Sequence, residues 1–200
     1  MNRDHIYSHL KNFSVGIAGA GGLGSNCAIA LTRTGIGKLV IADFDCVNWS
    51  NLNRQYYFND QIGIKKVIAL RKNILRISSS TVVEIHDIKL DPESIKNIFS
   101  KCDIIVEAFD DAGMKEMLAE TVLTKLPEIP LIMGSGMAGW GKTNILRERK
   151  IGDNLIVCGD EESEVSVDNP PLAARVAIVA NMQANAVVEL LMKRHEDITE

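Results

Sequence analysis

Two cations in the first third of the sequence, Arg54 and Lys66, stand on either side of a polar loop that follows an apolar run. Arginine can grip phosphate oxygens with two parallel hydrogen bonds, whereas lysine acts as a mobile point charge. Asn51 adds an amide donor without a charge of its own. These side chains could neutralise a polyphosphate while it binds and reacts. The alternative for Lys66, which has Lys65 as its neighbour, is a lysine that only solvates a helix face.

A glycine-rich turn lies upstream of that loop. Its residues Gly19, Gly21 and Gly24 satisfy the pattern G-x-G-x-x-G, and Gly22 lies inside it. Glycines let the backbone turn tightly and approach a phosphate, and the start of the following helix adds free N–H groups. Asp43 closes the next apolar run and could accept hydrogen bonds from ribose hydroxyls. We expect a nucleotide here rather than a tight turn without a ligand, but this pattern alone does not separate ATP from NAD.

Two acidic residues, Asp110 and Asp111, follow the apolar run 104–108. The carboxyl ends of parallel strands form the ligand crevice in α/β folds. Mg²⁺ in such a place takes one or two protein carboxylates along with phosphate oxygens and waters. Asp110 is therefore the candidate metal ligand. Helix capping is the alternative for both residues, and it is the favoured one for Asp111.

The elements that would position these residues alternate along the chain. Apolar runs are followed by amphipathic stretches, which is typical of a parallel sheet flanked by helices. We expect an irregular polar segment at 44–62, strands at 15–18, 39–42, 81–85, 104–108 and 131–133, and helices at 23–33, 63–77, 92–98 and 114–126. The pattern predicts an α/β fold with a Rossmann-like, mainly parallel sheet, in a single domain covering residues 1–200.

Beyond the fifth strand the alternation breaks. Two extra short strands are expected at 144–147 and 154–157, near the C-terminal end. The acidic stretch 160–168 is expected to be loose and exposed. A final helix at 173–193 is apolar on most sides, so we expect it to be buried. The glycine-rich segment after the fifth strand could wall a channel for a partner's extended tail, or it could form plain turns. Its residues are Gly136, Gly139, Trp140 and Gly141.

The composition narrows the class of protein. A net charge of −4 argues against general binding to nucleic acid or to a membrane surface. The four cysteines are isolated and form no CxxC pair, so we expect reduced thiols and no zinc site. The polar N-terminus is not typical of a signal peptide, and no uninterrupted apolar stretch is long enough to span a bilayer. A cytoplasmic protein is the prediction.

A long ordered motif carries a family resemblance. Residues 43–55 fit D-x-D-x-V-x-x-S-N-L-N-R-Q, residues 63–66 fit G-x-x-K, and the glycine turn fits G-x-G-G-L-G. In these motifs the chain resembles the ThiF/MoeB/HesA family, the bacterial relatives of ubiquitin-activating enzymes. The resemblance extends over residues 15–111 and is looser to the end. The segments 134–139 and 158–160 look like those of a short ThiF form.

The resemblance implies an adenylyltransferase that uses Mg²⁺ and ATP. Its substrate would be the C-terminal glycine carboxylate of a ubiquitin-like sulfur-carrier protein ending in Gly-Gly, of the ThiS type used in thiamine thiazole biosynthesis. Asp43 would hold the ribose, Asn51 and Arg54 the phosphates, and Lys66, rather than Lys65, the phosphates beside the attacked centre. Asp110 matches the family's metal-associated aspartate. A homodimer and a sulfur donor protein are also implied.

The chain departs from the family pattern in several places. Asp111 stands where relatives often have Asn. Arg3 is the only arginine ahead of the first strand, where relatives carry one that reaches the partner subunit's ATP, so that role is not transferred to it. The zinc-binding CxxC pairs are missing. Some relatives form a covalent intermediate on a cysteine; Cys158 is the one candidate for that thiol here, and a packed structural thiol is the favoured alternative.

Three other functions stay open. The same chemistry could act on a molybdopterin or cysteine carrier, on a small-molecule carboxylate, or on tRNA, which is the one case that would involve nucleic acid. The chain could instead be a nucleotide-binding relative without turnover. NAD-dependent reduction is disfavoured because the second half holds no recognisable catalytic acid.

Overall fold

The first half of the chain alternates strand and helix as predicted. The computed structural model describes residues 2–199, with side chains described for residues 2–194. After α1 (Arg3–Leu10) come β1 (Ser14–Ala18), α2 (Gly22–Thr34) and β2 (Lys38–Ala42). The predicted end of α2 at Gly35 is confirmed, since this residue caps the helix with a left-handed φ of 95°.

An irregular segment then joins β2 to α3 (Lys66–Ile77), as expected, with two short 3₁₀ turns at Trp49–Asn51 and Asn59–Gln61. α3 begins three residues later than predicted, and β3 (Val82–His86) follows it. Next comes α4 (Pro92–Phe99), which begins at its proline behind an Asp91 cap. β4 (Ile104–Glu107), α5 (Ala112–Lys125) and β5 (Leu131–Gly134) complete the regular alternation.

The last third departs from the predicted positions. The strand expected at 144–147 is wrong: Thr143–Ile145 forms a 3₁₀ turn, and β6 covers Arg147–Ile151 instead. β7 (Leu155–Gly159) starts one residue later than predicted and ends two later, and α6 covers Ala173–Thr199. β6 lies at the sheet edge with mostly exposed side chains, so it carries no apolar run that a sequence pattern could detect.

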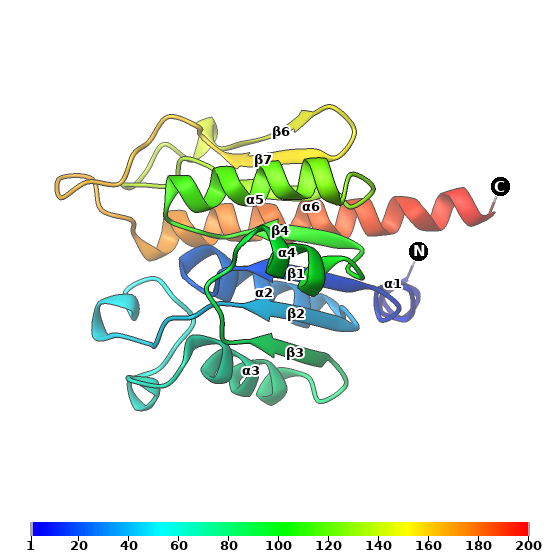
Figure 1. Ribbon diagram of the computed structural model, residues 1–200, viewed down its shortest axis with the longest axis horizontal. Helices are drawn as coiled ribbons and strands as arrows, with labels where there is room; N and C mark the ends of the chain where they lie inside the picture. Colours follow the sequence, from blue (N-terminus) through cyan, green and yellow to red (C-terminus); the bar gives the residue numbers. More distant parts are fainter. Residues whose placement is uncertain (1, 200) are drawn as a thin grey trace.

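One sheet holds all of these strands in the order β3-β2-β1-β4-β5-β7-β6 (Figure 1). Each pairing is parallel except that of β6 with β7. α2, α3 and α6 pack on one face of the sheet and α4 and α5 on the other. The predicted Rossmann-like α/β fold is confirmed, and it brings the ends of β1, β2 and β4 to one edge.

α6 differs from its prediction in burial. The stretch Ala173–Arg194 is long and apolar enough to cross a bilayer by length and composition alone, although Arg175 and Glu189 interrupt its apolar residues. In the structure it packs against α2 and β5. Only part of it is covered, since 44% of the apolar window is buried. One face of this helix therefore remains open.

The N-terminal leader forms α1 at the edge of the sheet opposite the glycine turn (Figure 1). Arg3 lies over the Tyr7 ring, 5.2 Å from its centroid. The Tyr7 hydroxyl donates a hydrogen bond of 2.5 Å to the carbonyl of Arg33, at the far end of α2. Arg3 is thus remote from the candidate site of its own chain.

Candidate active site

The glycine turn is packed so tightly that its backbone allows no side chain at two positions. Gly19 has a left-handed φ of 99°, and a Cβ on it would lie 2.8 Å from the carbonyl oxygen of Ala108. A Cβ on Gly24 would lie 1.9 Å from the carbonyl oxygen of Gly19. The turn therefore lies directly against the end of β4, and α2 starts from it at Gly22.

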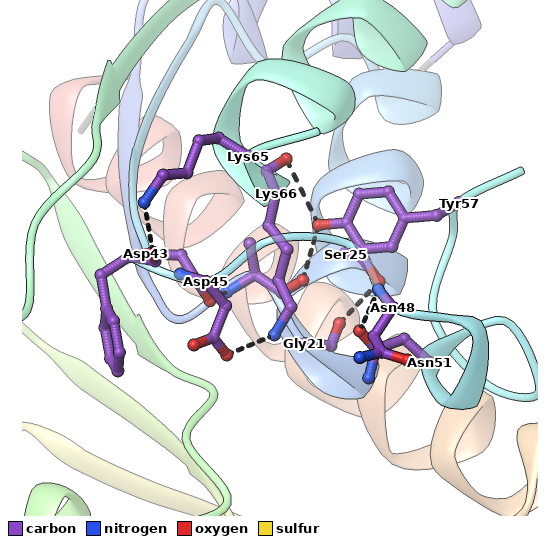
Figure 2. Close-up of polar contacts among 11 residues, drawn as sticks. Gly21, Ser25, Asp43, Asp45, Asn48, Asn51, Tyr57, Lys65 and Lys66 are labelled. Carbon is purple, nitrogen blue, oxygen red and sulfur yellow. Dashed lines mark hydrogen bonds and ion pairs between the residues drawn. The ribbon is translucent and has the colours of Figure 1, made fainter. Parts of the chain in front are cut away.

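Asp43 ties this turn to the polar loop after β2. Its carboxylate accepts the N–H of Ala20 at 2.7 Å on one oxygen and the N–H of Asp45 at 2.8 Å on the other (Figure 2). The side chain thus lies beside the glycine turn, where the ribose was expected. Its first function in this structure is to shape the loop that carries Asp45.

Lys66 is the buried one of the two lysines at the start of α3. Its residue is only 6% exposed, and its Nζ lies 2.7 Å from the Oδ2 of Asp45, whose side chain is 49% exposed. Lys65 pairs with Asp87 at 3.0 Å and donates to the carbonyl of Phe44 at 2.8 Å. Figure 2 shows the Lys65 and Lys66 side chains pointing in different directions. The two lysines therefore have different partners, since Lys66 pairs with Asp45 and Lys65 pairs with Asp87.

Tyr57 is a site residue that sequence reasoning missed. Its buried hydroxyl donates to the carbonyl of Ala20 at 2.7 Å and lies 3.4 Å from that of Lys66. Burial raises its pKa well above the usual value, and the charges of Asp43 and Asp45 add to this. The phenol therefore stays a neutral donor that joins the turn to the start of α3. A lone tyrosine in a polar loop gives no sequence signal of such a role.

Asn51 and Arg54 lie on the first 3₁₀ turn of the loop and just after it. The Oδ1 of Asn51 accepts the N–H of Asn48 at 2.9 Å, so its amide NH₂ is the part that can serve a ligand. The Nη1 of Arg54 donates to the carbonyl of Ser50 and to the Oδ1 of Asn53, and its stem lies 3.7 Å from the Cβ position of Gly22. Among the described residues, no carboxylate pairs with Arg54.

Gln55 supplies a further polar atom beside the turn. It is 9% exposed, and its Oε1 is buried without a hydrogen-bond partner among the described residues. Its Nε2 lies 3.8 Å from where a Cβ on Gly21 would be. An orphaned buried acceptor carries a free-energy cost unless a ligand or water satisfies it. The unpaired amide, the unneutralised guanidinium of Arg54 and the buried ammonium of Lys66 together fit a nucleotide bearing several phosphates.

The acidic end of β4 splits into two roles. Asp111 caps α5, with its Oδ1 accepting the N–H of Met114 at 2.8 Å, which was the favoured alternative for it. Asp110 is exposed at the same sheet edge as the glycine turn. The described residues contain no group of three potential metal ligands. A single open carboxylate still fits Mg²⁺, which relies on phosphate oxygens and water for its other ligands.

A buried ion pair, which the sequence pattern did not predict, holds the turn that carries Asp110. Glu107 is fully buried, and its carboxylate accepts from the Nζ of Lys115 at 2.8 and 3.0 Å and from the N–H of Phe109 at 2.6 Å. Lys115 also donates to the carbonyl of Gly134 at 2.8 Å. Burial raises the pKa of Glu107 despite this lysine. The pair fixes the ends of β4 and β5 side by side.

Cys158 does not fit a reactive thiol. It is fully buried in β7, and burial, with a smaller contribution from Glu148, raises its pKa to about 12. A thiol of that pKa holds almost no thiolate at neutral pH. The packed structural thiol is the alternative that this position matches. Cys27 and Cys102 are buried as well, whereas Cys46 is exposed.

The acidic stretch after β7 is not loose throughout, which corrects the prediction. Asp160 is buried, and its Oδ2 pairs with the buried guanidinium of Arg175. Its Oδ1 accepts the N–H groups of Glu162 at 2.9 Å and Ser163 at 2.8 Å. Arg175 also donates to the carbonyl of Gly141 at 2.6 Å. This second buried ion pair locks two loops together at the carboxyl edge of the sheet.

Fold and site define the class of this protein as a Rossmann-like α/β protein whose glycine turn faces a cluster of polar and cationic groups. Comparison with known proteins identifies the family. The ThiF family model matches residues 3–200. The chain belongs to the ThiF family, and the predicted resemblance is confirmed.

Several relatives are enzymes by name. The adenylyltransferase and sulfurtransferase MOCS3 of Caenorhabditis briggsae is 33% identical over 138 residues, covering 68% of this chain and 34% of that protein. A probable molybdopterin-synthase adenylyltransferase of Porphyra purpurea is 38% identical over 116 residues, covering 57% of this chain and 30% of that protein. The chain thus spans about a third of the length of these curated relatives.

A solved structure resembles the chain over nearly its full length. E. coli TcdA, a tRNA N6-threonylcarbamoyladenosine dehydratase solved in complex with AMP, superposes with a TM-score of 0.86 at 19% identity. The match covers 96% of this chain and 91% of that one. At this identity the likeness supports the fold alone.

Proposed function

We propose that this protein uses ATP to adenylate the C-terminal carboxylate of a ubiquitin-like sulfur-carrier protein that ends in Gly-Gly. The observation that carries the proposal is the buried ammonium of Lys66, whose half-exposed partner Asp45 is tied to the glycine turn through Asp43. A cation held in a nearly water-free place interacts strongly with a phosphate that arrives there.

The reaction forms one bond and breaks one. A carboxylate oxygen of the carrier attacks the α-phosphorus of ATP, the bond between the α- and β-phosphates breaks, and pyrophosphate leaves with the electron pair. No proton has to move, so the site needs charge and alignment rather than a general base. Arg54 and the amide of Asn51 would grip phosphate oxygens, and Lys66 would neutralise the charge that builds up at the attacked centre.

Mg²⁺ belongs to the same proposal. Asp110 would hold the ion from the end of β4, and the ion would supply charge neutralisation on the phosphates. The buried pair of Glu107 and Lys115 keeps the Asp110 turn in place by accepting the N–H of Phe109. Asp43 would meet the ribose at the end of β2.

The tail of the carrier has to reach the phosphate-binding groups. A Gly-Gly tail is slender enough to thread toward the α-phosphate, and we favour a ThiS-type carrier of thiamine thiazole synthesis. The names of the relatives, which include a probable molybdopterin-synthase adenylyltransferase, instead support a molybdopterin-type carrier. A sulfur donor protein would act after adenylation. The proposal also places the protein in the cytoplasm, and the free cysteines among the described residues support that location.

We also infer that two copies associate. The support is an open groove of about 620 Å³ beside α6 and β6, lined by Ala174, Ala177, Ile178, Met182 and Glu148 among others. An apolar helix face of this kind tends to be covered in the working protein. Light scattering across a concentration series should give twice the mass of 22.0 kDa, and Ala177→Glu should return the single-chain mass.

Carrier-dependent exchange of radioactive pyrophosphate into ATP tests the function. ThiS-type and molybdopterin-type carriers ending in Gly-Gly should be compared, each beside a version lacking the last glycine. Exchange with at least one full-length carrier and none with its truncated version is the expected result. Binding of ATP by calorimetry, with no exchange for any carrier, would instead favour a nucleotide-binding protein without turnover. Preferential binding of NAD would revive the reductase alternative.

A further inference from the structure

Two loops at the carboxyl edge of the sheet form a surface that the phosphate chemistry does not use. We call residues 136–142 and 160–172 the loop platform (upper left in Figure 1). Gly139 bridges to Pro171 and donates its N–H to the carbonyl of Pro170 at 3.0 Å. The N–H of Ala138 donates to the Oγ of Ser163 at 3.2 Å. The two loops are therefore one connected surface.

The loop platform is held in shape from below. Arg175 joins its two halves by donating to the carbonyl of Gly141 and to the buried carboxylate of Asp160. A Cβ on Gly136 would lie 1.9 Å from the Oδ1 of Asp160, and one on Gly139 would lie 2.2 Å from the Oδ1 of Asn169. Loops that are already ordered cost little further entropy when a partner binds.

The outer side of the loop platform presents apolar groups to water. Trp140 is 80% exposed and Val167 is 96% exposed, and Val165 and Leu172 are exposed as well. A tryptophan held out by a rigid loop is unfavourable in a protein that works alone, whereas it is a common anchor in protein interfaces. The surface therefore has the composition of a binding site for another protein.

The charge of the loop platform selects the partner. Glu162, Glu164 and Asp168 are exposed, and among the described residues none of them forms an ion pair. Their neighbour Glu161 differs, because Arg149 pairs with it and lowers its pKa. Three unpaired carboxylates around exposed apolar groups attract a basic protein surface and repel a polyanion such as tRNA.

The loop platform adjoins the candidate site. Arg175 is followed by Val176 in the first turn of α6, and a Cβ on Gly22 would lie 3.0 Å from Val176 and 3.7 Å from the stem of Arg54. A protein seated on the loop platform could therefore send an extended tail along the start of α2 to the phosphate-binding groups.

We propose that the loop platform docks the body of the carrier protein through a basic, partly apolar face that flanks its Gly-Gly tail. Trp140 is the apolar anchor, and Glu162, Glu164 and Asp168 make the charge contacts. This inference rests on the proposed function, because it takes the adenylated carrier as the occupant. It adds the surface that selects the carrier and the charge that the carrier must bear.

The test compares two charge-matched triple variants and one anchor variant. The first triple is Glu162→Lys, Glu164→Lys and Asp168→Lys. The control triple is Glu120→Lys, Glu128→Lys and Asp153→Lys, which reverses three exposed acids outside the loop platform. The anchor variant is Trp140→Ala. Carrier KM and kcat are measured by pyrophosphate exchange, ATP affinity by calorimetry, and carrier affinity by calorimetry without turnover.

We expect the platform triple and Trp140→Ala each to raise the carrier KM and Kd about 10-fold or more, as loss of interface charge or of an aromatic anchor does. Saturating kcat and ATP affinity should stay unchanged, and the control triple should stay within about twofold of wild type, because screening weakens remote charges. Added salt should weaken carrier binding to wild type more than to the platform triple.

An unchanged carrier Kd in the platform triple overturns the inference, as does an equal loss in the control triple. Tighter tRNA binding to the wild type than to the platform triple would also overturn it. Failure of the proposed function looks different, because wild type would then show no exchange with any carrier. If exchange occurs but the carrier KM is the same in the platform triple as in wild type, the proposed adenylation is retained and the proposed docking surface is wrong.

Discussion

Two buried cations, Lys66 and Arg175, show how the halves of this molecule differ. Both are almost fully enclosed, and each pairs with an aspartate at the carboxyl edge of the sheet. The partner of Lys66 is Asp45, whose side chain is 49% exposed, whereas that of Arg175 is Asp160, whose side chain is 2% exposed. In the Lys66 pair the aspartate is accessible to solvent, so we call it the open pair. In the Arg175 pair both side chains are shielded from solvent, so we call it the closed pair.

The difference separates a site that can exchange partners from one that holds shape. Asp45 can rotate into water when a phosphate approaches Lys66, at little cost, because its carboxylate is already half hydrated. Asp160 cannot leave Arg175 without stranding a charge in the interior. The first half of the chain therefore carries most of the candidate chemistry, to which β4 adds Asp110, and the loops after β5 carry a rigid surface.

The largest effect should come from breaking the closed pair. Arg175→Met leaves Asp160 buried without its cation, and we expect the free energy of unfolding to fall by about 3–5 kcal/mol. Urea denaturation of the variant measures this. The matched control is Arg149→Met, which breaks the exposed pair with Glu161 and should cost at most about 1 kcal/mol. Equal losses in the two variants would erase the distinction between closed and open pairs.

Breaking the open pair should affect catalysis and leave stability almost intact. Lys66→Met should reduce carrier-dependent pyrophosphate exchange by about 10²–10³-fold, the usual loss on removing one preorganised charge-stabilising donor. Lys65→Met is the matched control, because that ammonium points to Asp87, and it should keep exchange within about threefold of wild type. A larger loss in Lys65→Met than in Lys66→Met would reverse the assignment.

The pH dependence of stability tests the contribution of Asp160 to the closed pair. Burial acts to raise its pKa, but hydrogen bonds from the N–H groups of Ser163 and Glu162 and from Arg175 outweigh burial, so the pKa is lowered. A lowered folded-state pKa stabilises the fold fully above the unfolded value of about 3.9, and that contribution is lost as the pH falls through the folded value.

The advantage of wild type over Asp160→Asn in free energy of unfolding should therefore be constant from pH 7 to about 4.5 and shrink below that. Urea titrations at a series of pH values measure it. Glu164→Gln, at an exposed position, should show no such trend. A gap that stays constant down to pH 2.5 would mean that Asp160 is not the group that titrates.

The smallest effect should be that of the thiol in the second half. Cys158→Ala should keep exchange within about threefold of wild type, because a buried thiol with a raised pKa is a poor nucleophile. In the native protein, iodoacetamide should label Cys46 rapidly and Cys158 only after unfolding. A carrier adduct on Cys158, detected by mass spectrometry, would show that the loops open more than this structure indicates.

The first half could be predicted from sequence because its signals are local. Glycine at position 35 marks the end of α2, and the acidic residue Asp43 marks the end of β2, so nearby residues indicate these boundaries. The loop with Asn51 and Arg54 is one contiguous motif. What escaped were tertiary contacts of otherwise ordinary residues, such as the Tyr57 hydroxyl at the carbonyl of Ala20.

The second half could be predicted only in outline. Asp160 lies in an acidic stretch of the sequence, and its ion pair with Arg175 forms only because the fold places the start of α6 beside it. Glu107 and Lys115 look like ordinary surface charges until β4 and α5 come together. β6 was misplaced because a strand exposed at an edge has no apolar pattern. The chemistry of such pairs depends on burial, which periodicity does not report.

The charged edge strand has a consequence for how the protein tolerates crowding. An open sheet offers unpaired backbone groups at its rim, which invite another extended chain to join and can seed fibrils. β6 carries four charged residues in succession, at 147–150, and most of its side chains face water. A strand from another chain would have to desolvate these four charged side chains in order to pair with β6. The hairpin of β6 and β7 therefore disfavours edge-to-edge aggregation.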